Sequence, residues 1–582
     1  MNTTPDDTDR FAELDSKSFV PRVAGYLRYM GPGYLQSAMT LGGGSAFAAL
    51  FGGAAFGYQL LWVAPTAMLL GIIVLSAVAW QTLSTGEDPY DALKRRVHPV
   101  FAWMFAWGGL LSSIIWQFAQ YALAGAMISM LFGTTPIAGG IIALAWCVSV
   151  GLMHGRAPRF IRGYELILTG MVWFIVLSMA AVVARTGIPN PGEMIAGFIP
   201  SIPADWEGVN ADGAPASIDS VTVIVSGLAA AVGANMLFVY PYTLRKDGWG
   251  RAHRRLARYD LVFGMFLPFS LAVSLMVIAS AAVFHYGDAG FTGAKIAPAK
   301  AAEIFAAPER LGPVVGKWIF GLGILAMALS SITMQMLASG FAGVKLFGVK
   351  EDSPGHKFFI VLPAIGFLGA VFWGDIAPWV AVPTNVVCGL FLPVSYLGFT
   401  LLQRNRDFLA EDTPRGALAT AWLAGMALAT IVLTVFLATV VVQQGPGFLE
   451  RLLPGEKRVH HRGTEGAEGH RGVGWCMLEH DGGVAVRDRD RQPPCSSMLS
   501  KRNSVALHAA LCDSVVNSDT EDAEGHRGVG WCMREHDSGV AVRDLDRQPP
   551  CSSMLSKRHS VALCALCDSV VNSNKANEPA TA

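Results

Sequence analysis

Long apolar stretches alternate with short polar segments along the first 445 residues of the chain. A stretch of about 20 apolar residues is long enough to cross the hydrocarbon core of a membrane as a helix. Eleven stretches fit this description, at residues 31–52, 57–83, 101–132, 136–153, 163–185, 221–244, 259–284, 313–342, 358–374, 379–402 and 417–443. The pattern predicts an all-α integral membrane domain with eleven transmembrane helices at residues 31–445, after a polar segment at residues 1–30.

Positive charge is concentrated in alternate loops between these stretches. The basic residues lie within 94–96, 156–162, 245–258, 345–357 and 404–415. Because basic loops tend to stay on the cytoplasmic side, we expect these loops and the amino terminus to face the cytoplasm. The first thirty residues contain no signal-peptide pattern, and the expected location is the bacterial inner (plasma) membrane, crossed many times.

Residues 446–582 form a tail of different composition that contains a near-identical tandem repeat. Residues 467–518 recur as residues 523–573, and seven of the nine cysteines lie in this tail. Histidines near the cysteines leave open a metal-binding or disulfide-linked module. Two copies without helical or strand periodicity favour a poorly ordered appendage instead, so we expect its removal to leave the membrane domain intact.

A run of three glycines and a serine, Gly42-Gly43-Gly44-Ser45, lies in the middle of the first expected span. Consecutive glycines hold a helix poorly, and unwound backbone at membrane depth is tolerated only where it is buried in protein or lines a cavity. We therefore expect an unwound segment that forms part of a substrate site. Nothing resembles a P-loop, a nucleophile with its base or a dinucleotide fingerprint, so neither an enzyme nor a cofactor is expected. No basic domain suggests nucleic-acid binding.

The residues on both sides of this run match a known family. Gly31-Pro32-Gly33-Tyr34-Leu35 precedes the run and residues 56–63 follow it, in a gapless match to the first two helices of that family. Shorter matches lie at residues 81–86, 233–234, 281–285, 330–331 and 392–393. Over residues 25–445 the chain resembles the natural-resistance-associated macrophage protein (Nramp) family of proton-coupled divalent-metal transporters. The resemblance implies a leucine-transporter-like fold, with 5+5 inverted repeats and broken helices 1 and 6 that meet at the membrane midplane.

The positions that carry the family's metal chemistry differ in this chain. The family has Asp-Pro-Gly-Asn where Gly42 to Ser45 stand, so the metal-binding carboxylate is absent. Leu237-Phe238-Val239 replaces Met-Pro-His of helix 6, although Met236 lies one residue away and a shift in alignment would restore a sulfur ligand. Gln117 and Gln120 stand where helix 3 carries an aspartate and a glutamate on the proton route. Glutamine cannot carry a proton, so no relay is visible.

The polar residues near the expected breaks form the candidate substrate site. These are Gly42, Gly43, Gly44, Ser45, Gln117, Gln120, Asn235, Met236, Thr384 and Asn385, the last two in place of a Ser-Gln pair in helix 10 of the family. Neutral oxygens do little to offset the energetic cost of removing water from a divalent cation, so an ionic substrate would keep part of its water shell. No resident metal site is assigned. The same amides and hydroxyls could instead simply join helices. The acids Glu165, Asp260 and Asp375 lie near helix ends and are expected at the interface.

Three functions remain open at this stage. The first is a secondary transporter or facilitator of divalent cations, with altered selectivity and without proton coupling. The second is a transporter of the same fold for a small neutral or anionic solute, because positive half-helix ends in a carboxylate-free cavity suit an anion. The third is a membrane sensor or scaffold that binds a ligand without moving it. In the first case, Gly42→Asp is expected to raise the affinity for divalent ions; protein partners are unknown.

Overall fold

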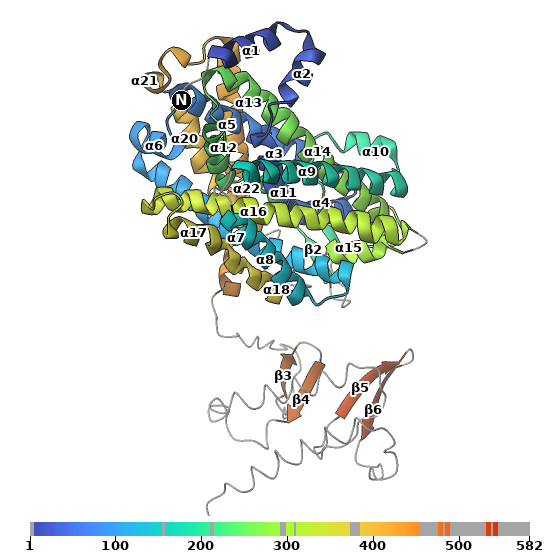
Figure 1. Cartoon of the computed structure of the whole chain (residues 1–582). Coiled ribbons are helices and arrows are strands. Elements are labelled where there is room, and N and C mark those ends of the chain that lie inside the picture. Colours follow the sequence, from blue (N-terminus) through green and yellow to red (C-terminus); the bar gives the residue numbers. More distant parts are fainter. Residues whose placement is uncertain are drawn as a thin grey trace, which may run out of the picture. The chain divides into compact units, whose positions relative to one another are not determined.

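The structure, a computed structural model, describes residues 5–153, 158–209, 215–291, 298–307, 310–372 and 384–452, and four strands in the tail (Figure 1). The chain divides into two compact units, residues 1–457 and 458–582. The first unit is a bundle of helices. The second contributes two short hairpins to the described residues.

The helices of the first unit follow one another with short connections. Its first half contains α1 (Pro5–Ser16), α2 (Phe19–Leu27), α3 (Pro32–Thr40), α4 (Gly43–Phe56), α5 (Val63–Thr85), α6 (Pro89–Arg96), α7 (Pro99–Phe132), α8 (Pro136–Met153), α9 (Pro158–Thr186) and α10 (Pro191–Ala196). Its second half contains α11 (Ser220–Ala231), α12 (Ala234–Lys246), α13 (Arg254–Leu261), α14 (Leu267–Ser280), α15 (Pro298–Phe305), α16 (Phe320–Phe347), α17 (Pro354–Val361), α18 (Leu368–Phe372), α20 (Leu392–Arg404), α21 (Arg406–Leu409) and α22 (Ala417–Leu452). A small antiparallel hairpin, β1 (Trp206–Val209) and β2 (Pro215–Ile218), precedes α11.

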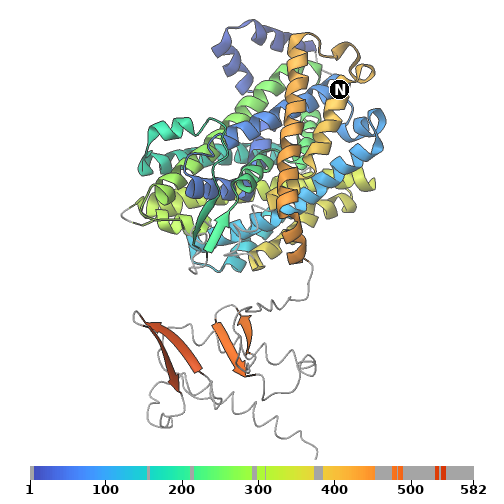
Figure 2. The same cartoon turned by 180° about the vertical axis from the view of Figure 1, so that it is seen from behind.

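Ten segments of the described residues are long and apolar enough to cross a membrane, and the bent pair of α3 and α4 makes an eleventh. The prediction of eleven spans is thus confirmed. α7 and α16 lie side by side through the bundle (Figure 1). Figure 2 shows α22 as a long orange helix that runs along the face of the bundle turned toward the viewer, next to α20.

The first span is broken at Leu41 and Gly42. α3 ends at Thr40, α4 begins at Gly43, and the two helices differ in direction by 56°. The expectation of unwound backbone is wrong for Gly43, Gly44 and Ser45, which form the first turn of α4. The Ser45 hydroxyl accepts a hydrogen bond from the Gly42 N–H at 3.0 Å, and this cap stabilises a helix start at Gly43, ahead of the expected end of the unwound segment.

The sixth span is broken at Val232 and Gly233. Both residues have extended backbone, between the end of α11 and the start of α12. The breaks in the first and sixth spans meet, since the Thr40 hydroxyl donates to the Ala231 carbonyl at 2.6 Å. That carbonyl is one of the unpaired groups at the end of α11, so the contact satisfies it. The predicted breaks in helices 1 and 6 are confirmed.

Asp260 is fully buried, so its carboxylate is bonded within the protein and is not solvated by water. Its carboxylate accepts hydrogen bonds from the Gly31 N–H at 3.1 Å, the Gly33 N–H at 2.6 Å and the Tyr240 hydroxyl at 3.1 Å. The N–H groups at the start of α3 have no partner within the helix, and a carboxylate at this positive end satisfies them. Asp260 therefore ties the start of α3 to α12 and α13. Asp375 lies outside the described residues.

Each copy of the tail repeat contains one antiparallel hairpin. The strands are β3 (Trp475–His480) with β4 (Gly483–Asp488), and β5 (Trp531–His536) with β6 (Gly539–Asp544). The two hairpins have the same register. The sequence showed no evident strand periodicity in the repeat, yet these residues form strands. Alternating valines, and the Asp-Gly sequence between the strands of the first copy, are the hairpin features that the sequence analysis passed over.

Candidate functional site

The glycines of the run leave room for side chains from other helices. A Cβ atom at Gly42 would overlap the Gln120 amide and the Ser331 side chain, and a Cβ atom at Gly44 would overlap the Asn385 amide. These amides and the hydroxyl can approach the backbone of the first span because glycine has no side chain. The glycines of the run therefore act mainly by leaving space for these side chains, and less by unwinding the helix.

Gln120 joins the two sides of the helix break. Its carbonyl oxygen accepts from the Gly43 N–H at 2.6 Å, and its amide donates to the Ser331 hydroxyl at 2.9 Å. Ser331 in turn donates to the Met39 carbonyl at 2.8 Å. The amide of Gln335, one turn further along α16, also donates to Ser331, at 3.0 Å. α7 and α16 thereby satisfy the free N–H at the start of α4 and a free carbonyl at the end of α3.

Asn385 makes a second set of bonds to the same break. Its amide donates to the Gly44 carbonyl at 3.2 Å and to the Ser226 hydroxyl at 2.9 Å. Its carbonyl oxygen accepts from the Trp116 indole at 2.8 Å. The fully buried Asn385 side chain therefore links the tenth span with α4, α7 and α11.

A polar cavity with an empty volume of about 280 Å³ lies beside these residues. It is lined by Met39, Thr40, Gly44, Ser45, Trp116, Gln120, Ala230, Met236, Gln335 and Asn385. Half of the ten residues predicted from the sequence are among them, namely Gly44, Ser45, Gln120, Met236 and Asn385. The structure therefore brings the broken first and sixth spans, α7, α16 and the tenth span to one cavity.

The other five predicted residues lie outside the lining of this cavity. Gly42 lies in the helix break and Gly43 directly follows it, and the Gln120 side chain packs against both. Gln117 donates to the Ile332 carbonyl at 3.0 Å, and Asn235 donates to the Ser113 hydroxyl at 3.2 Å. Thr384 is buried next to Asn385. Gln117 and Asn235 thus join helices, as polar residues in membrane bundles often do.

Gln335, Trp116 and Thr40 line the cavity and were missed from the sequence. Ser331 had been noted as part of a family match, and Gln335 lies four residues later on the same helix. Residues four apart share a helix face, so this spacing could have identified Gln335. Trp116 precedes Gln117 directly and had no such pattern to mark it.

The cavity is neutral, and each of its side-chain amides already donates at least one hydrogen bond within the protein. None of its lining residues is acidic or basic. The amides of Gln120, Gln335 and Asn385 all donate to protein acceptors. The Gln335 carbonyl oxygen, in contrast, accepts no hydrogen bond from any described residue, although it is buried. In the described part of the chain, no three His, Cys, Asp or Glu side chains come together in a way that could hold a metal ion.

A second cavity lies next to the first and is also lined by residues of α3, α12 and α16. Its lining includes Leu35, Val239, Glu165, Lys246 and Asp247. Burial, together with the nearby Glu165 carboxylate, raises the pKa of Asp247 to about 7. Asp247 therefore loses its negative charge as the pH falls below neutral. Charged groups thus surround this second cavity and are absent from the lining of the first.

A bundle of eleven spans, in which two broken helices meet at a buried polar cavity, has the architecture of a membrane transporter. A family model described as natural resistance-associated macrophage protein-like matches residues 33–442, well over half of the chain. The chain belongs to the Nramp family and is an integral membrane protein. The resemblance seen in the sequence is confirmed.

The relatives of this chain are distant in sequence. The divalent metal cation transporter MntH of Chromohalobacter salexigens is 24% identical over 71% of this chain and 91% of its own length. The MntH protein of Mycobacterium leprae is 22% identical over 66% of this chain and 85% of its own. A crystal structure of the Eremococcus coleocola manganese transporter has a TM-score of 0.60 at 16% identity, and covers 74% of this chain and 90% of that one. This last match shows that the fold is shared.

Proposed function

We propose that this protein transports divalent metal cations through the polar cavity and holds the ion by neutral oxygens while the ion keeps part of its water shell. The relatives named as divalent metal cation transporters support the ion class. The altered residues of the cavity lead us to infer a different selectivity and no proton coupling through α7.

The unused Gln335 oxygen is the observation that carries this proposal. A buried polar atom without a partner costs about 1–3 kcal/mol, and a bound ion or water is a common reason for one. The Gln335 oxygen can accept from the water shell of a cation or contact the cation itself. Each amide of the cavity already donates within the protein, whereas the Gln335 oxygen accepts no bond, so we infer that the free acceptor favours a cation or a water of its shell.

The positive ends of the half-helices do not favour an anion here. The Gly42 N–H donates to Ser45, the Gly43 N–H to Gln120 and the Gly233 N–H to the Met236 sulfur. These are three of the N–H groups through which a helix start would bind an anion. An anion at these positions would have to displace a protein acceptor from each, which weakens the alternative of an anionic solute.

The same contacts favour weak discrimination among divalent ions. No carboxylate lines the cavity, so a bare ion would lose its hydration without compensation, and a strongly hydrated ion such as Mg²⁺ fits best with its waters retained. The Met236 sulfur lines the cavity, but it accepts from the Gly233 N–H at 3.3 Å. A sulfur engaged in this way gives little preference for Mn²⁺ over Mg²⁺ or Ca²⁺.

In this proposal, α7 offers no titratable side chain that could carry a coupled proton. Gln117 and Gln120 bond to backbone groups, and Val239 stands where the family has a histidine.

For the placement in the membrane, we propose that the amino terminus and the basic loops face the cytoplasm. We also propose that the membrane is the inner membrane of a bacterium, because the named relatives are bacterial.

Uptake of Mg²⁺, Mn²⁺ and Ca²⁺ into proteoliposomes, with and without the Gln335→Met substitution, tests this proposal. The substitution keeps the side-chain length and removes the oxygen. Loss of one hydrogen bond to a charged group, about 1.5 kcal/mol, should weaken the apparent affinity about tenfold. Gln403→Met is the matched control, because Gln403 is a buried glutamine on α20, bonded to Gln81 and absent from the cavity lining.

Two results would contradict the proposal. One is unchanged cation uptake in Gln335→Met. The other is uptake of amino acids with no competition from divalent ions, which would support a small organic solute instead. Binding of Mg²⁺ without any uptake would favour the sensor or scaffold.

A further inference from the structure

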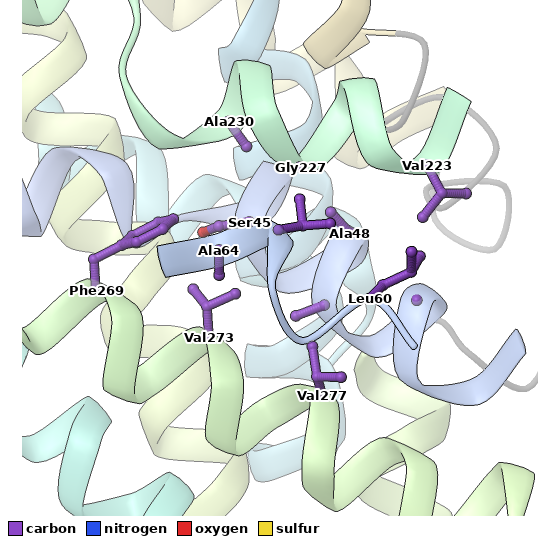
Figure 3. A pocket seen from close by; sticks show the side chains of 13 residues that line it. Ser45, Ala48, Leu60, Ala64, Val223, Gly227, Ala230, Phe269, Val273 and Val277 are labelled. Carbon is purple, nitrogen blue, oxygen red and sulfur yellow. The ribbon is translucent and has the colours of Figure 1, made fainter. Parts of the chain in front are cut away.

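Three apolar side chains of α2 are exposed, in contrast to those inside the bundle. Between the spans, apolar side chains point toward one another, as Val273 of α14 and Ala48 of α4 do (Figure 3). In α2 the exposed fraction is 67% for Phe19, 74% for Val20 and 43% for Leu27. An apolar patch of this kind, on a helix of nine residues, marks a surface that binds a partner or a membrane.

The exposed apolar residues of α2 share one face of the helix. At about 100° per residue, an arc of about 140° holds four of them, namely Phe19, Val20, Ala24 and Leu27. Arg22 and Arg28 lie beyond the two edges of this arc. The Arg22 guanidinium donates to the Lys17 carbonyl at 2.6 Å, which holds it beside the apolar face. α2 therefore has the pattern of a helix that lies in a membrane surface.

Ring contacts attach α2 to the start of the seventh span. The buried Tyr26 ring stacks on Tyr259 of α13 with centroids 4.6 Å apart, and Tyr259 stacks on Phe263 at 6.2 Å. Val262, next to Phe263, is exposed on the seventh span, where lipid surrounds the bundle. The dark-blue helices α1 and α2 lie at the edge of the bundle in Figure 1 and in Figure 2. α2 is therefore beside the lipid-facing surface of the bundle.

The length of α3 places α2 at the level of the membrane surface. α3 has nine residues between Pro32 and the helix break, so at about 1.5 Å per residue its start lies about 14 Å from the break. Half of the hydrocarbon core is about 15 Å thick, and broken helices of this fold meet near its centre. The start of α3 is thus at the edge of the hydrocarbon. α2 ends at Leu27, shortly before α3, so it lies where head groups and acyl chains meet.

We propose that α2 is a membrane-binding helix, whose apolar face inserts among the acyl chains while Arg22 and Arg28 contact anionic phospholipid head groups. The leaflet is the one on the amino-terminal side of the membrane. Insertion removes the exposed apolar side chains from water, and the negative surface potential of an anionic leaflet attracts the arginines. No residue of α2 lines the polar cavity, so this inference is independent of the proposed function.

The test uses the full chain in phosphatidylglycerol–phosphatidylcholine vesicles, with phosphatidylglycerol that carries a photoactivatable group on an acyl chain. Mass spectrometry then maps the lipid adducts. Adducts are expected on peptides that cover residues 18–28, and at Leu177 of α9, which is 64% exposed and serves as the lipid-facing reference. Val20→Asp should remove the adducts on α2 and leave those at Leu177. Ala12→Asp, which adds the same charge to an exposed position of α1, should keep both.

The head-group contact is tested with Arg28→Gln, at an exposed position. This variant should give fewer adducts on α2 than the wild type in vesicles that contain phosphatidylglycerol. The difference should disappear in pure phosphatidylcholine with a photoactivatable phosphatidylcholine. An equal wild-type yield on α2 in both kinds of vesicle would overturn the choice of anionic lipid.

Two further results would overturn the membrane contact itself. One is labelling at Leu177 without any adduct on residues 18–28. The other is cross-linking of α2 to a second copy of the chain in place of lipid. None of these measurements depends on ion uptake, so failure of this inference is distinguished from failure of the proposed function.

Discussion

At the scale of single residues, the absence of a side chain and the orientation of amides determine the candidate site. Gly42 and Gly44 admit Gln120 and Asn385 to the backbone of the first span. The sequence identified the glycines by their place in an apolar span, Gln120 by the family's proton route in helix 3, and Asn385 by a polar pair in helix 10 of the family. It could not show that the glycines and the amides depend on each other, because that dependence comes from the packing of distant spans.

The first prediction concerns Gly42. Gly42→Ala should lower the free energy of unfolding by about 1–3 kcal/mol, since its Cβ atom would overlap the Ser331 side chain as well as the more flexible Gln120 amide. Thermal unfolding in detergent measures the effect. Gly170→Ala is the control, because a Cβ atom there meets nothing within 4 Å, and it should be neutral or slightly stabilising.

The Gly42→Asp substitution is subject to the same overlap. The earlier expectation of a simple gain in divalent-ion affinity is therefore revised, and the variant should first lose stability. If Gly42→Ala is as stable as the wild type, the close packing described for this break is wrong.

At the scale of elements, the sequence predicted both helix breaks but misplaced the first one. The glycine content suggested unwinding through Ser45, yet the Ser45 hydroxyl caps the start of α4 and restores the helix. The partners of Asp260 could not be predicted for a related reason. The acid was expected at the interface from its place near a helix end, while its partners, Gly31 and Gly33, lie more than 220 positions away in the chain.

The second prediction concerns the bond between Asp260 and α3. Asp260→Ala leaves the Gly31 and Gly33 N–H groups and the Tyr240 hydroxyl without this acceptor, and should cost about 2 kcal/mol or more of stability. Tyr240→Phe removes one of the three bonds and should cost about 1 kcal/mol. Hydrogen exchange should increase over residues 31–40 in Asp260→Ala. Unchanged exchange there would show that Asp260 does not hold the start of α3.

At the scale of the whole molecule, the membrane domain and the tail are separate units. The number of spans could be predicted because apolar length alone identifies a transmembrane helix. The cavity could be predicted only in part, because Trp116 and Gln335 are brought to it by the packing of α7 and α16. The role of the repeated tail stays a prediction.

The third prediction is that removal of residues 454–582 leaves the membrane domain folded and cation uptake unchanged. The described residues 5–452 include all the transmembrane candidates and every residue that lines the polar cavity. Size-exclusion chromatography and proteoliposome uptake of the truncated chain measure this. Aggregation of the truncated chain, or loss of its uptake, would assign the tail a necessary role.

The central claim is that a neutral cavity carries divalent cations without protons. Its most direct test records Mg²⁺ uptake and internal pH in the same proteoliposomes, with ionophore controls for the membrane potential. The account predicts saturable Mg²⁺ uptake that Mn²⁺ and Ca²⁺ inhibit at similar concentrations, with no internal acidification, since Gln117 and Gln120 cannot release a proton. Acidification that rises in proportion to Mg²⁺ uptake, or the absence of any divalent-cation uptake, would contradict it.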